Sequence, residues 1–341
     1  MSTRAFITGV SGLELTAEER AFLRAERPWG FILFKRNIDN PAQVARLVEE
    51  LRGTTGDLDA PVLIDQEGGR VQRLGPPHWP VYPPGAVFST LYDIKPELGL
   101  RAAWLSSRLM AADLVDLGIT VDCLPLADVP VAGADAVIGN RAYGTEPAKV
   151  AIIARAVTDG LADGGILPVL KHIPGHGRAT ADSHLRLPTV DTSAAELEAS
   201  DFAAFRPLAD LPMAMTAHVV FSALDAAQPA TTSATIIAQV IRGSIGFQGL
   251  LMSDDVSMNA LAGSISERTR AIVAAGCDVV LHCNGKLDEM RDVVAETPML
   301  ERQALDRAKA AVAVRRQPRP FDRVAAWAEL DALVAQAGAG A

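Results

Sequence analysis

The chain contains little cysteine. Only Cys123, Cys277 and Cys283 occur among its 341 residues, and no two of them form a CxxC pair. An odd number of cysteines in apolar stretches favours buried free thiols in a reducing cytosol over disulfides. The N-terminal residues, MSTRAFITGVSG, also lack the apolar core of a signal peptide. We therefore expect a cytoplasmic protein.

Basic residues are in deficit. The 32 lysines and arginines are outnumbered by 41 aspartates and glutamates, which gives a formal net charge of −9. A protein that tracks nucleic-acid phosphates needs a basic stripe, and none is present. The apolar runs have the length of a strand and are too short to span a bilayer. The sequence therefore argues against nucleic acid and membrane as partners, and it leaves the oligomeric state open, a monomer included.

Two common phosphate-binding patterns are absent. No GxGxxG leads from an apolar run into a helix-like stretch, and no GxxxxGK[ST] occurs. Both absences argue against binding of a dinucleotide or a nucleotide phosphate, and we expect no cofactor. No linker, charge block or short repeat divides the interior. We therefore predict one domain over residues 1–341, in which about residues 300–341 form helices that pack on the rest.

Eight short apolar runs recur along the chain, separated by amphipathic stretches. They cover residues 5–9, 30–34, 61–65, 119–125, 166–172, 213–219, 249–255 and 277–283. Strands that alternate with helices over this length predict an α/β protein, a single-domain (β/α)8 barrel of the TIM type. The runs are continuous rather than alternating, as is typical of strands buried on both faces.

Most of these apolar runs end in polar residues. The polar ends are 35–37, 65–67, 171–172, Thr216 with His218, and 253–255. In a barrel the C-terminal ends of all strands open on the same face. We therefore predict a ligand-binding site on that face, built from these residues.

Histidine is sparse, yet three of the six histidines lie in the segment KHIPGHGRATADSH at 171–184. Asp182 and His184 are two residues apart, a spacing that places both side chains on the same side of an extended segment. A carboxylate bonded to one ring nitrogen fixes the tautomer and raises the basicity of the other nitrogen, which suits proton transfer near neutral pH. A turn carboxylate beside a surface histidine is the simpler alternative.

The same segment raises the question of a metal site. His172, His176 and His184 could combine with Asp254 to bind zinc. An HxxxH pair binds zinc when both rings lie on one helical face, and the proline and glycines of IPGHG preclude a helix there. We therefore predict no metal.

Two further stretches carry candidate carboxylates. In SDD, Asp254 and Asp255 end an apolar run, so one side chain faces the barrel axis and the other faces away. We expect one to act as a nucleophile or electrostatic stabiliser and the other to cap the following helix, and the spacing does not say which. In DQEGGRVQRL, Asp65 could accept sugar hydroxyl hydrogens or pair with an arginine in a structural role. Arg141, in VIGNRAYG, has the same two alternatives.

The segment 171–184 resembles the K-H-[FI]-P-G-H-G-x4-D-S-H signature of glycoside hydrolase family 3, in its β-N-acetylhexosaminidase branch. Further stretches agree in order and spacing from about residue 5 to about 290, namely GFILFKRN, IDQEGGRVQRL, VIGNRAYG, MTAH and MSDDVSM. The chain departs from the family pattern at SMNA for S-M-E-G, at DCLPLADV for N-F-A-P-V-x-D-V, and at Arg178, where aspartate is common.

The resemblance implies an activity and the residues that carry it. The family branch removes N-acetylglucosamine from the non-reducing end of 1,6-anhydro-N-acetylmuramyl peptides in cell-wall recycling, with retained configuration and without a metal. Asp254 matches the nucleophile, His184 the general acid/base, and Asp182 the carboxylate that orients it. The positions that bind the sugar unit are matched by Asp65, Arg73, Arg141, Lys171 and His172.

Several alternatives remain open from the sequence. The substrate's acetamido oxygen could replace Asp254 as nucleophile, and other glycosides could be cut as well. A neutral His184 base would not repel an anion, so phosphate could compete with water and give phosphorolysis. We expect the segment 171–184 to close over the site only when substrate is present. A sugar-binding protein on an inactive barrel and a metallohydrolase are two alternatives of another class.

Overall fold

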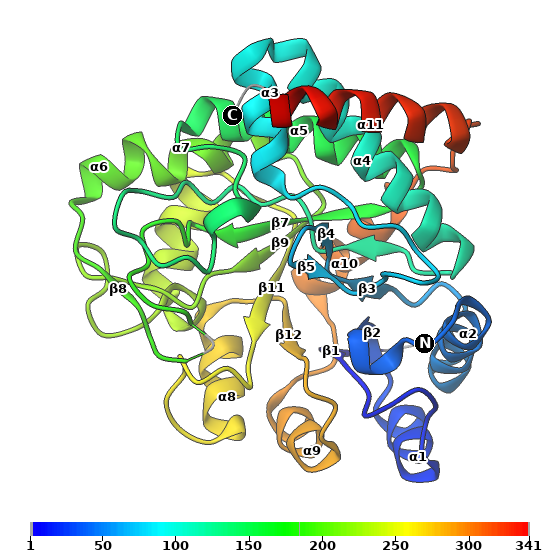
Figure 1. Cartoon of the computed structure of the whole chain (residues 1–341). Coiled ribbons are helices and arrows are strands. Elements are labelled where there is room, and N and C mark those ends of the chain that lie inside the picture. The colour runs from blue at the N-terminus through cyan, green and yellow to red at the C-terminus, as the bar shows by residue number, and fades with distance from the viewer. Residues whose placement is uncertain (1–2, 184, 340–341) are drawn as a thin grey trace.

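The computed structural model describes residues 3–183 and 185–339 (Figure 1). Within this part of the chain, eight parallel strands close into a barrel. The strands are β1 (Arg4–Thr8), β2 (Pro28–Leu33), β3 (Val62–Ile64), β6 (Val121–Asp122), β7 (Leu167–Ile173), β9 (Met213–Thr216), β11 (Leu250–Asp255) and β12 (Val279–His282). Each predicted apolar run overlaps one of them, and β1 pairs with β12 to close the barrel. The predicted (β/α)8 barrel is confirmed.

Helices surround this barrel (Figure 1). They are α1 (Ala17–Glu26), α2 (Pro41–Thr55), α3 (Gly85–Ile94), α4 (Pro96–Asp116), α5 (Pro147–Asp163), α6 (Ala194–Ala199), α7 (Asp201–Phe205), the π-helix η5 (Ile236–Ser244), α8 (Ile265–Ala275), α9 (Leu287–Glu296), α10 (Arg302–Ala313) and α11 (Arg323–Ala339). Short 3-10 turns are η1 (Lys35–Asn37), η2 (Gly139–Arg141), η3 (Arg206–Leu208) and η4 (Ala230–Thr232). Outside the barrel, β4 (Gln66–Gly68) pairs with β5 (Val71–Gln72), and β8 (Thr189–Val190) pairs with β10 (Val220–Phe221).

Local sequence signals set the helix ends. The Thr16 hydroxyl accepts the N–H of Glu19 at the start of α1, and the Glu19 carboxylate accepts the N–H of Thr16 in return, a capping box. Ser264 and Glu267 form the same box at α8. The expectation that an aspartate of the SDD stretch caps this helix is wrong. The loop 256–264 separates β11 from α8, and Ser264 occupies the cap position.

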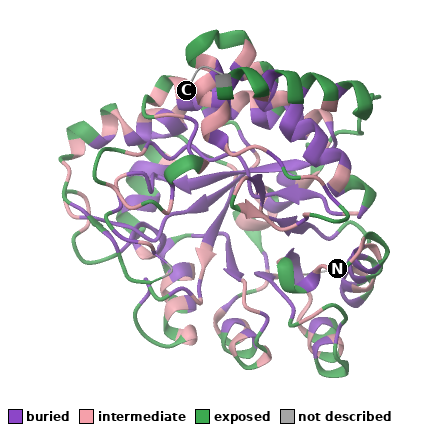
Figure 2. Ribbon diagram, viewed as in Figure 1, coloured by how far each residue is buried: buried purple, intermediate pink, exposed green. Residues whose placement is uncertain are grey.

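Apolar side chains form two layers, one inside the barrel and one between the barrel and its helices. Figure 2 shows the barrel strands buried and the outer helix faces exposed. The inner layer includes Ile7, Leu63, Val169, Met213, Met252 and Leu281. Ala308 and Ala311 of α10 join this layer at its end, and α11 lies along α3 and α4, where Trp327 meets Tyr82 with ring centres 5.1 Å apart. The C-terminal helices therefore extend the apolar core.

Two further observations bear on the sequence-based expectations. All three cysteines are unpaired; Cys123 and Cys277 are buried, whereas Cys283 is only partly buried. Among the residues that the structure describes, no helix combines the length and apolar character needed to cross a membrane.

Candidate active site

A cavity of about 140 Å³ opens at the C-terminal ends of the barrel strands. It is lined by Ile32, Phe34, Asp65, Glu67, Val71, Arg73, Arg141, Lys171, His172, Met215, Asp254, Asp255, Met258, Leu281 and Cys283. The five predicted sugar-binding residues and the predicted nucleophile are all in this lining. The structure therefore brings these six side chains together on the face where a barrel carries its active site.

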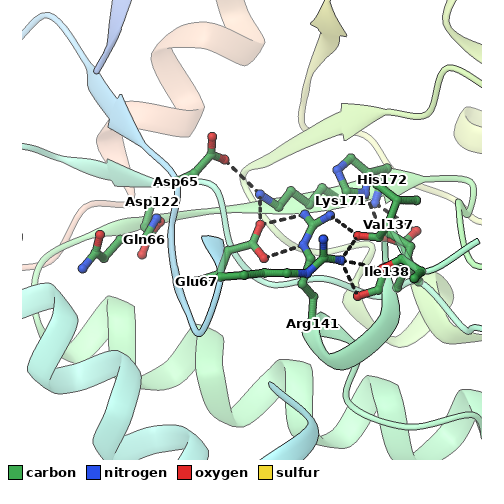
Figure 3. Close-up of polar contacts among 12 residues, drawn as sticks. Asp65, Gln66, Glu67, Asp122, Val137, Ile138, Arg141, Lys171 and His172 are labelled. Atoms are coloured by element: carbon green, nitrogen blue, oxygen red, sulfur yellow. Dashed lines mark hydrogen bonds and ion pairs between the residues drawn. The ribbon is translucent and has the colours of Figure 1, made fainter. Parts of the chain in front are cut away.

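An ion-pair network forms one wall of the cavity (Figure 3). The Lys171 ammonium lies 3.0 Å from Asp65 Oδ1 and 2.6 Å from Glu67 Oε1. Arg73 donates to Asp65 Oδ2 at 2.8 Å. Arg141 donates to both oxygens of Glu67, each at 2.8 Å. Each carboxylate thus contacts two cations, which restricts its orientation and that of its partners.

The charges of this network stabilise one another. Burial alone would raise the pKa of Asp65, but Lys171 and Arg73 outweigh it and hold that pKa well below its usual range. Burial likewise acts to raise the pKa of Glu67, and Arg141 and Lys171 lower it. Burial would lower the pKa of Lys171, whose side chain is 2% exposed, but the two carboxylates raise it. All the groups are therefore charged near neutral pH and suited to bind the hydroxyl groups of a sugar.

His172 has its tautomer set by a buried carboxylate. Its Nδ1 lies 2.8 Å from Asp128 Oδ2, and its backbone N–H points to Asp128 Oδ1 at 3.3 Å. Burial would raise the pKa of Asp128, but His172 and further N–H donors lower it, so the carboxylate is ionised. Nδ1 is then the donor, and a neutral ring has Nε2 as its acceptor. Because His172 lines the cavity, Nε2 can accept a hydrogen bond from a sugar hydroxyl.

Sequence reasoning missed Asp128 as a member of this site, and it included Glu67 among the polar strand ends without assigning it a role. Glu67 follows Asp65 at a spacing of two, which in an extended strand end places both carboxylates on one side. Asp128 is a single acidic residue in the apolar stretch CLPLADVPV, and a buried charge of this kind requires a partner. These signals could have assigned a role to Glu67 and identified Asp128 as a candidate.

The two aspartates at the end of β11 have different environments. Asp255 Oδ1 accepts the backbone N–H of Ser257 at 3.0 Å and of Cys283 at 3.1 Å, and its Oδ2 accepts the Ser257 hydroxyl at 2.6 Å. Asp255 therefore stabilises the turn after β11 and ties it to the end of β12. This local role supports Asp254 as the candidate nucleophile, which stays a prediction.

The polar residues at the end of β9 support β11 instead of binding a ligand. Thr216 Oγ1 accepts the backbone N–H of Asp254 at 3.3 Å and lies 2.8 Å from Thr231 Oγ1. His218 bonds Thr231 Oγ1 through Nδ1 at 2.7 Å and the Asp255 carbonyl through Nε2 at 3.0 Å. Thr216 and His218 are fully buried, and neither lines the cavity. The expectation that every polar strand end faces the ligand is therefore too broad.

The predicted acid/base pair is described only in part. His184 lies outside the described residues. Asp182 is half-buried and does not line the cavity. The carbonyl of Ser183, the residue between them, accepts the backbone N–H of Ala260 at 3.2 Å. This contact places Ser183 beside the segment that follows β11, and the roles of Asp182 and His184 stay predictions.

Residues 7–314 match the glycosyl hydrolase family 3 N terminal domain. The chain belongs to glycosyl hydrolase family 3. The resemblance seen in the motifs is confirmed, and this chain is therefore a glycoside hydrolase.

Named relatives of this family 3 chain cover most of its length. A beta-hexosaminidase from Alkalilimnicola ehrlichii is 40% identical over 282 residues, which are 81% of this chain and 79% of that protein. A beta-hexosaminidase from Neisseria meningitidis serogroup C is 40% identical over 298 residues, 83% of this chain and 79% of that protein. NagZ from Neisseria gonorrhoeae in complex with N-trifluoroacetyl-D-glucosamine superposes with a TM-score of 0.84 at 33% identity, covering 99% of this chain and 98% of that one.

This family 3 barrel also buries a carboxyl group without a cationic hydrogen-bond partner. Asp122 stands where the family pattern has asparagine, at the end of β6. Its Oδ1 accepts the backbone N–H of Gln66 at 3.0 Å, and its Oδ2 has no hydrogen-bond partner among the described residues. Burial raises the pKa of Asp122 well above its usual value, and the nearby Asp65 and Glu67 act in the same direction. Asp122 is therefore protonated in the native state at pH values where an exposed aspartate is ionised.

We expect Asp122→Asn to stabilise this family 3 protein, by an amount that grows with pH. The unfolded chain releases the proton above pH ~4 while the native state keeps it, so wild-type stability falls by up to about 1.4 kcal/mol per pH unit until the native pKa is reached. Asparagine carries no such proton and can still accept the Gln66 N–H. Urea unfolding across the neutral range measures both proteins. A stability difference that does not change with pH would contradict this expectation.

Proposed function

We propose that this chain, a glycoside hydrolase of the β-N-acetylhexosaminidase type, removes N-acetylglucosamine from the non-reducing end of peptidoglycan fragments in the cytoplasm. The proposed substrates are 1,6-anhydro-N-acetylmuramyl peptides released during cell-wall recycling. The observation that carries the proposal is that Asp254 and the charged network around Lys171 line the same cavity. Similarity to a NagZ that binds N-trifluoroacetyl-D-glucosamine supports the choice of sugar.

The size of the cavity supports removal of one terminal unit. Its volume of about 140 Å³ lies below the roughly 300–1,000 Å³ that drug-sized ligands occupy. Such a cavity suits one sugar ring, which enters with its non-reducing end first. The remainder of the substrate would then extend away from the barrel axis, over the loops that follow the strands.

In the proposed reaction Asp254 attacks the anomeric carbon, and His184 protonates the oxygen of the departing group. A glycosyl–enzyme ester forms as the glycosidic bond breaks. His184, now neutral, then takes a proton from water, whose oxygen attacks the anomeric carbon and releases Asp254. Two displacements at the same carbon retain its configuration. Asp182 would orient the His184 ring and stabilise its charged form.

The charged network would hold the sugar ring during both steps. Asp65 accepts hydrogen bonds from hydroxyl groups, while Lys171 and Arg141 donate to hydroxyl oxygens. His172 adds an acceptor through Nε2, as its bond to Asp128 requires. Because the ion pairs fix the orientation of these side chains, little reorganisation is needed when the sugar binds.

A set of aryl β-glycosides that differ only at carbon 2 tests the specificity. We expect kcat/KM for the 2-acetamido sugar to exceed that for the 2-hydroxy sugar by on the order of 10²-fold or more, because a site built around a polar substituent rejects the analogue that lacks it. Asp254→Ala supplies the background rate for each substrate. Equal turnover of the two sugars would point to a family 3 glycosidase of broader specificity.

A further inference from the structure

A chain of hydrogen bonds runs from the sugar cavity to the loop that carries Asp182. It starts at His172, which lines the cavity and bonds Asp128 Oδ2 through Nδ1 at 2.8 Å. The other oxygen of Asp128 accepts the backbone N–H of His176 at 2.7 Å. The ring of His176 then reaches along the loop, and its Nε2 lies 3.0 Å from Ser183 Oγ. Two residues, Asp128 and His176, thus connect His172 to Ser183, the residue that follows Asp182.

The residues that connect His172 to the loop by hydrogen bonds are buried. Asp128, His176 and Ser183 are 0%, 3% and 3% exposed. Burial, with a contribution from His172, lowers the pKa of His176 to about 4, so its ring is neutral at physiological pH. Among the residues that the structure describes, its buried Nδ1 has no hydrogen-bond partner, and the ring bonds the loop through Nε2. A buried unsatisfied nitrogen costs about 1–3 kcal/mol, which a residue of purely structural use could avoid with an apolar side chain.

The loop is attached firmly at its start. At Gly177 a Cβ atom would stand 2.1 Å from the Val129 carbonyl oxygen, so the backbone lies directly against that segment. Arg178 donates to Asp201 Oδ2 at 2.6 Å, which ties the loop to α7. The hydrogen bond from His176 to Ser183 links this fixed start of the loop to its later part. Ser183 directly follows Asp182 and precedes His184 in the sequence, so its position constrains that of Asp182.

We infer that His176 and Ser183 are positioning residues that hold the Asp182–His184 pair in register with the sugar cavity, through the hydrogen bond between His176 Nε2 and Ser183 Oγ. The inference rests on the proposed acid/base role of His184. Loss of this bond lets the tripeptide shift relative to the anomeric carbon. Protonation of the leaving oxygen then suffers, while binding of the sugar by Asp65 and Lys171 does not.

The leaving-group dependence of kcat/KM tests the inference. Aryl N-acetylglucosaminides range from activated nitrophenols, which depart without a proton, to phenol, which needs one. For Ser183→Ala and His176→Phe we expect kcat/KM to fall on the order of tenfold or more with phenol and less than about twofold with the most activated nitrophenol, because acid catalysis contributes about 10²–10⁴-fold only where a proton is required. Ser183→Thr keeps the hydroxyl, so its kcat/KM should depend on the leaving group as weakly as that of wild type.

Two further variants serve as controls for this test. Ser222→Ala is the matched control, since its hydroxyl bonds Val190 and Asp191 at the far end of the same loop and should leave the dependence unchanged. His184→Ala should give the steepest dependence of all. Suppose that it does, while Ser183→Ala and His176→Phe lower kcat/KM equally for all substrates or for none. The inference is then wrong, and the proposed function stands. If His184→Ala itself gives no such dependence, the acid/base assignment and the inference both fall.

Discussion

Asp254→Asn is expected to lower kcat/KM by a factor on the order of 10⁴–10⁶, because a displaced nucleophile leaves only binding and electrostatic stabilisation to act on the substrate. The fold should be unaffected. The Asp254 carboxylate accepts the neighbouring Asp255 N–H at 2.8 Å, and an asparagine oxygen can accept the same bond. The free energy of unfolding should therefore stay within about 0.5 kcal/mol of wild type. Turnover of an aryl N-acetylglucosaminide and urea unfolding measure the two quantities.

Asp255→Asn is the matched control and should show the opposite pattern. Its carboxylate accepts two backbone N–H groups and the Ser257 hydroxyl. Weakening these charged bonds should cost about 1–3 kcal/mol of stability, with a far smaller loss of turnover than at position 254. If position 255 proves the more damaging to turnover, the nucleophile has been assigned to the wrong aspartate.

A covalent trap separates direct attack from participation of the substrate's acetamido group. After incubation with a 5-fluoro N-acetylglucosaminyl donor, mass spectrometry should find the sugar on the peptide that contains Asp254. The Asp254→Asn protein should carry none. An unlabelled wild-type enzyme that still turns over would instead assign the nucleophile to the acetamido oxygen, with Asp254 stabilising that group.

The barrel could be predicted from the sequence because its signal is local. Each apolar run is a continuous buried strand, and each polar end marks the face on which the site opens, so Asp65, Lys171 and Asp254 could be assigned to one cavity. The spacing of Asp254 and Asp255 could not predict how they divide their roles, and only the family resemblance assigned the nucleophile to Asp254. The role of Asp255 depends on Cys283, which follows β12 and donates its N–H to Asp255.

The absence of a predicted role for Glu67 and Asp128 has the same explanation. Glu67 is held by Arg141, which lies 74 positions away in the chain, and Asp128 bonds the histidines 44 and 48 positions away. Such pairs depend on how the loops after the strands fold back over the barrel. Chain periodicity contains no information about that folding. A family motif identifies segments of the sequence, but the contacts between those segments are seen only in the three-dimensional structure.

Lys171→Met should be the most destabilising substitution in the site, with a loss of about 3–5 kcal/mol in the free energy of unfolding. Lys171 is buried and contacts both Asp65 and Glu67. Removal of Lys171 takes one of two cations from each of these buried carboxylates at once, and a single arginine remains beside each. Turnover should fall as well, since the cation that would hold the sugar is gone. Urea unfolding measures the first effect and kcat/KM the second.

The loss from Lys171→Met should shrink as the pH falls. In wild type the pKa values of Asp65 and Glu67 are lowered, so the stability that they contribute is present above the carboxyl pKa of the unfolded chain, near 4, and is lost on acidification. Without Lys171 both carboxyl groups take up protons more readily. Protonation at low pH then removes the free-energy cost of burying their charges. Lys149→Met is the control, because its partner Asp93 is 68% exposed and such pairs contribute at most about 1 kcal/mol. Equal losses at the two lysines, or a Lys171→Met loss that does not change with pH, would show that the buried network does not stabilise the barrel end.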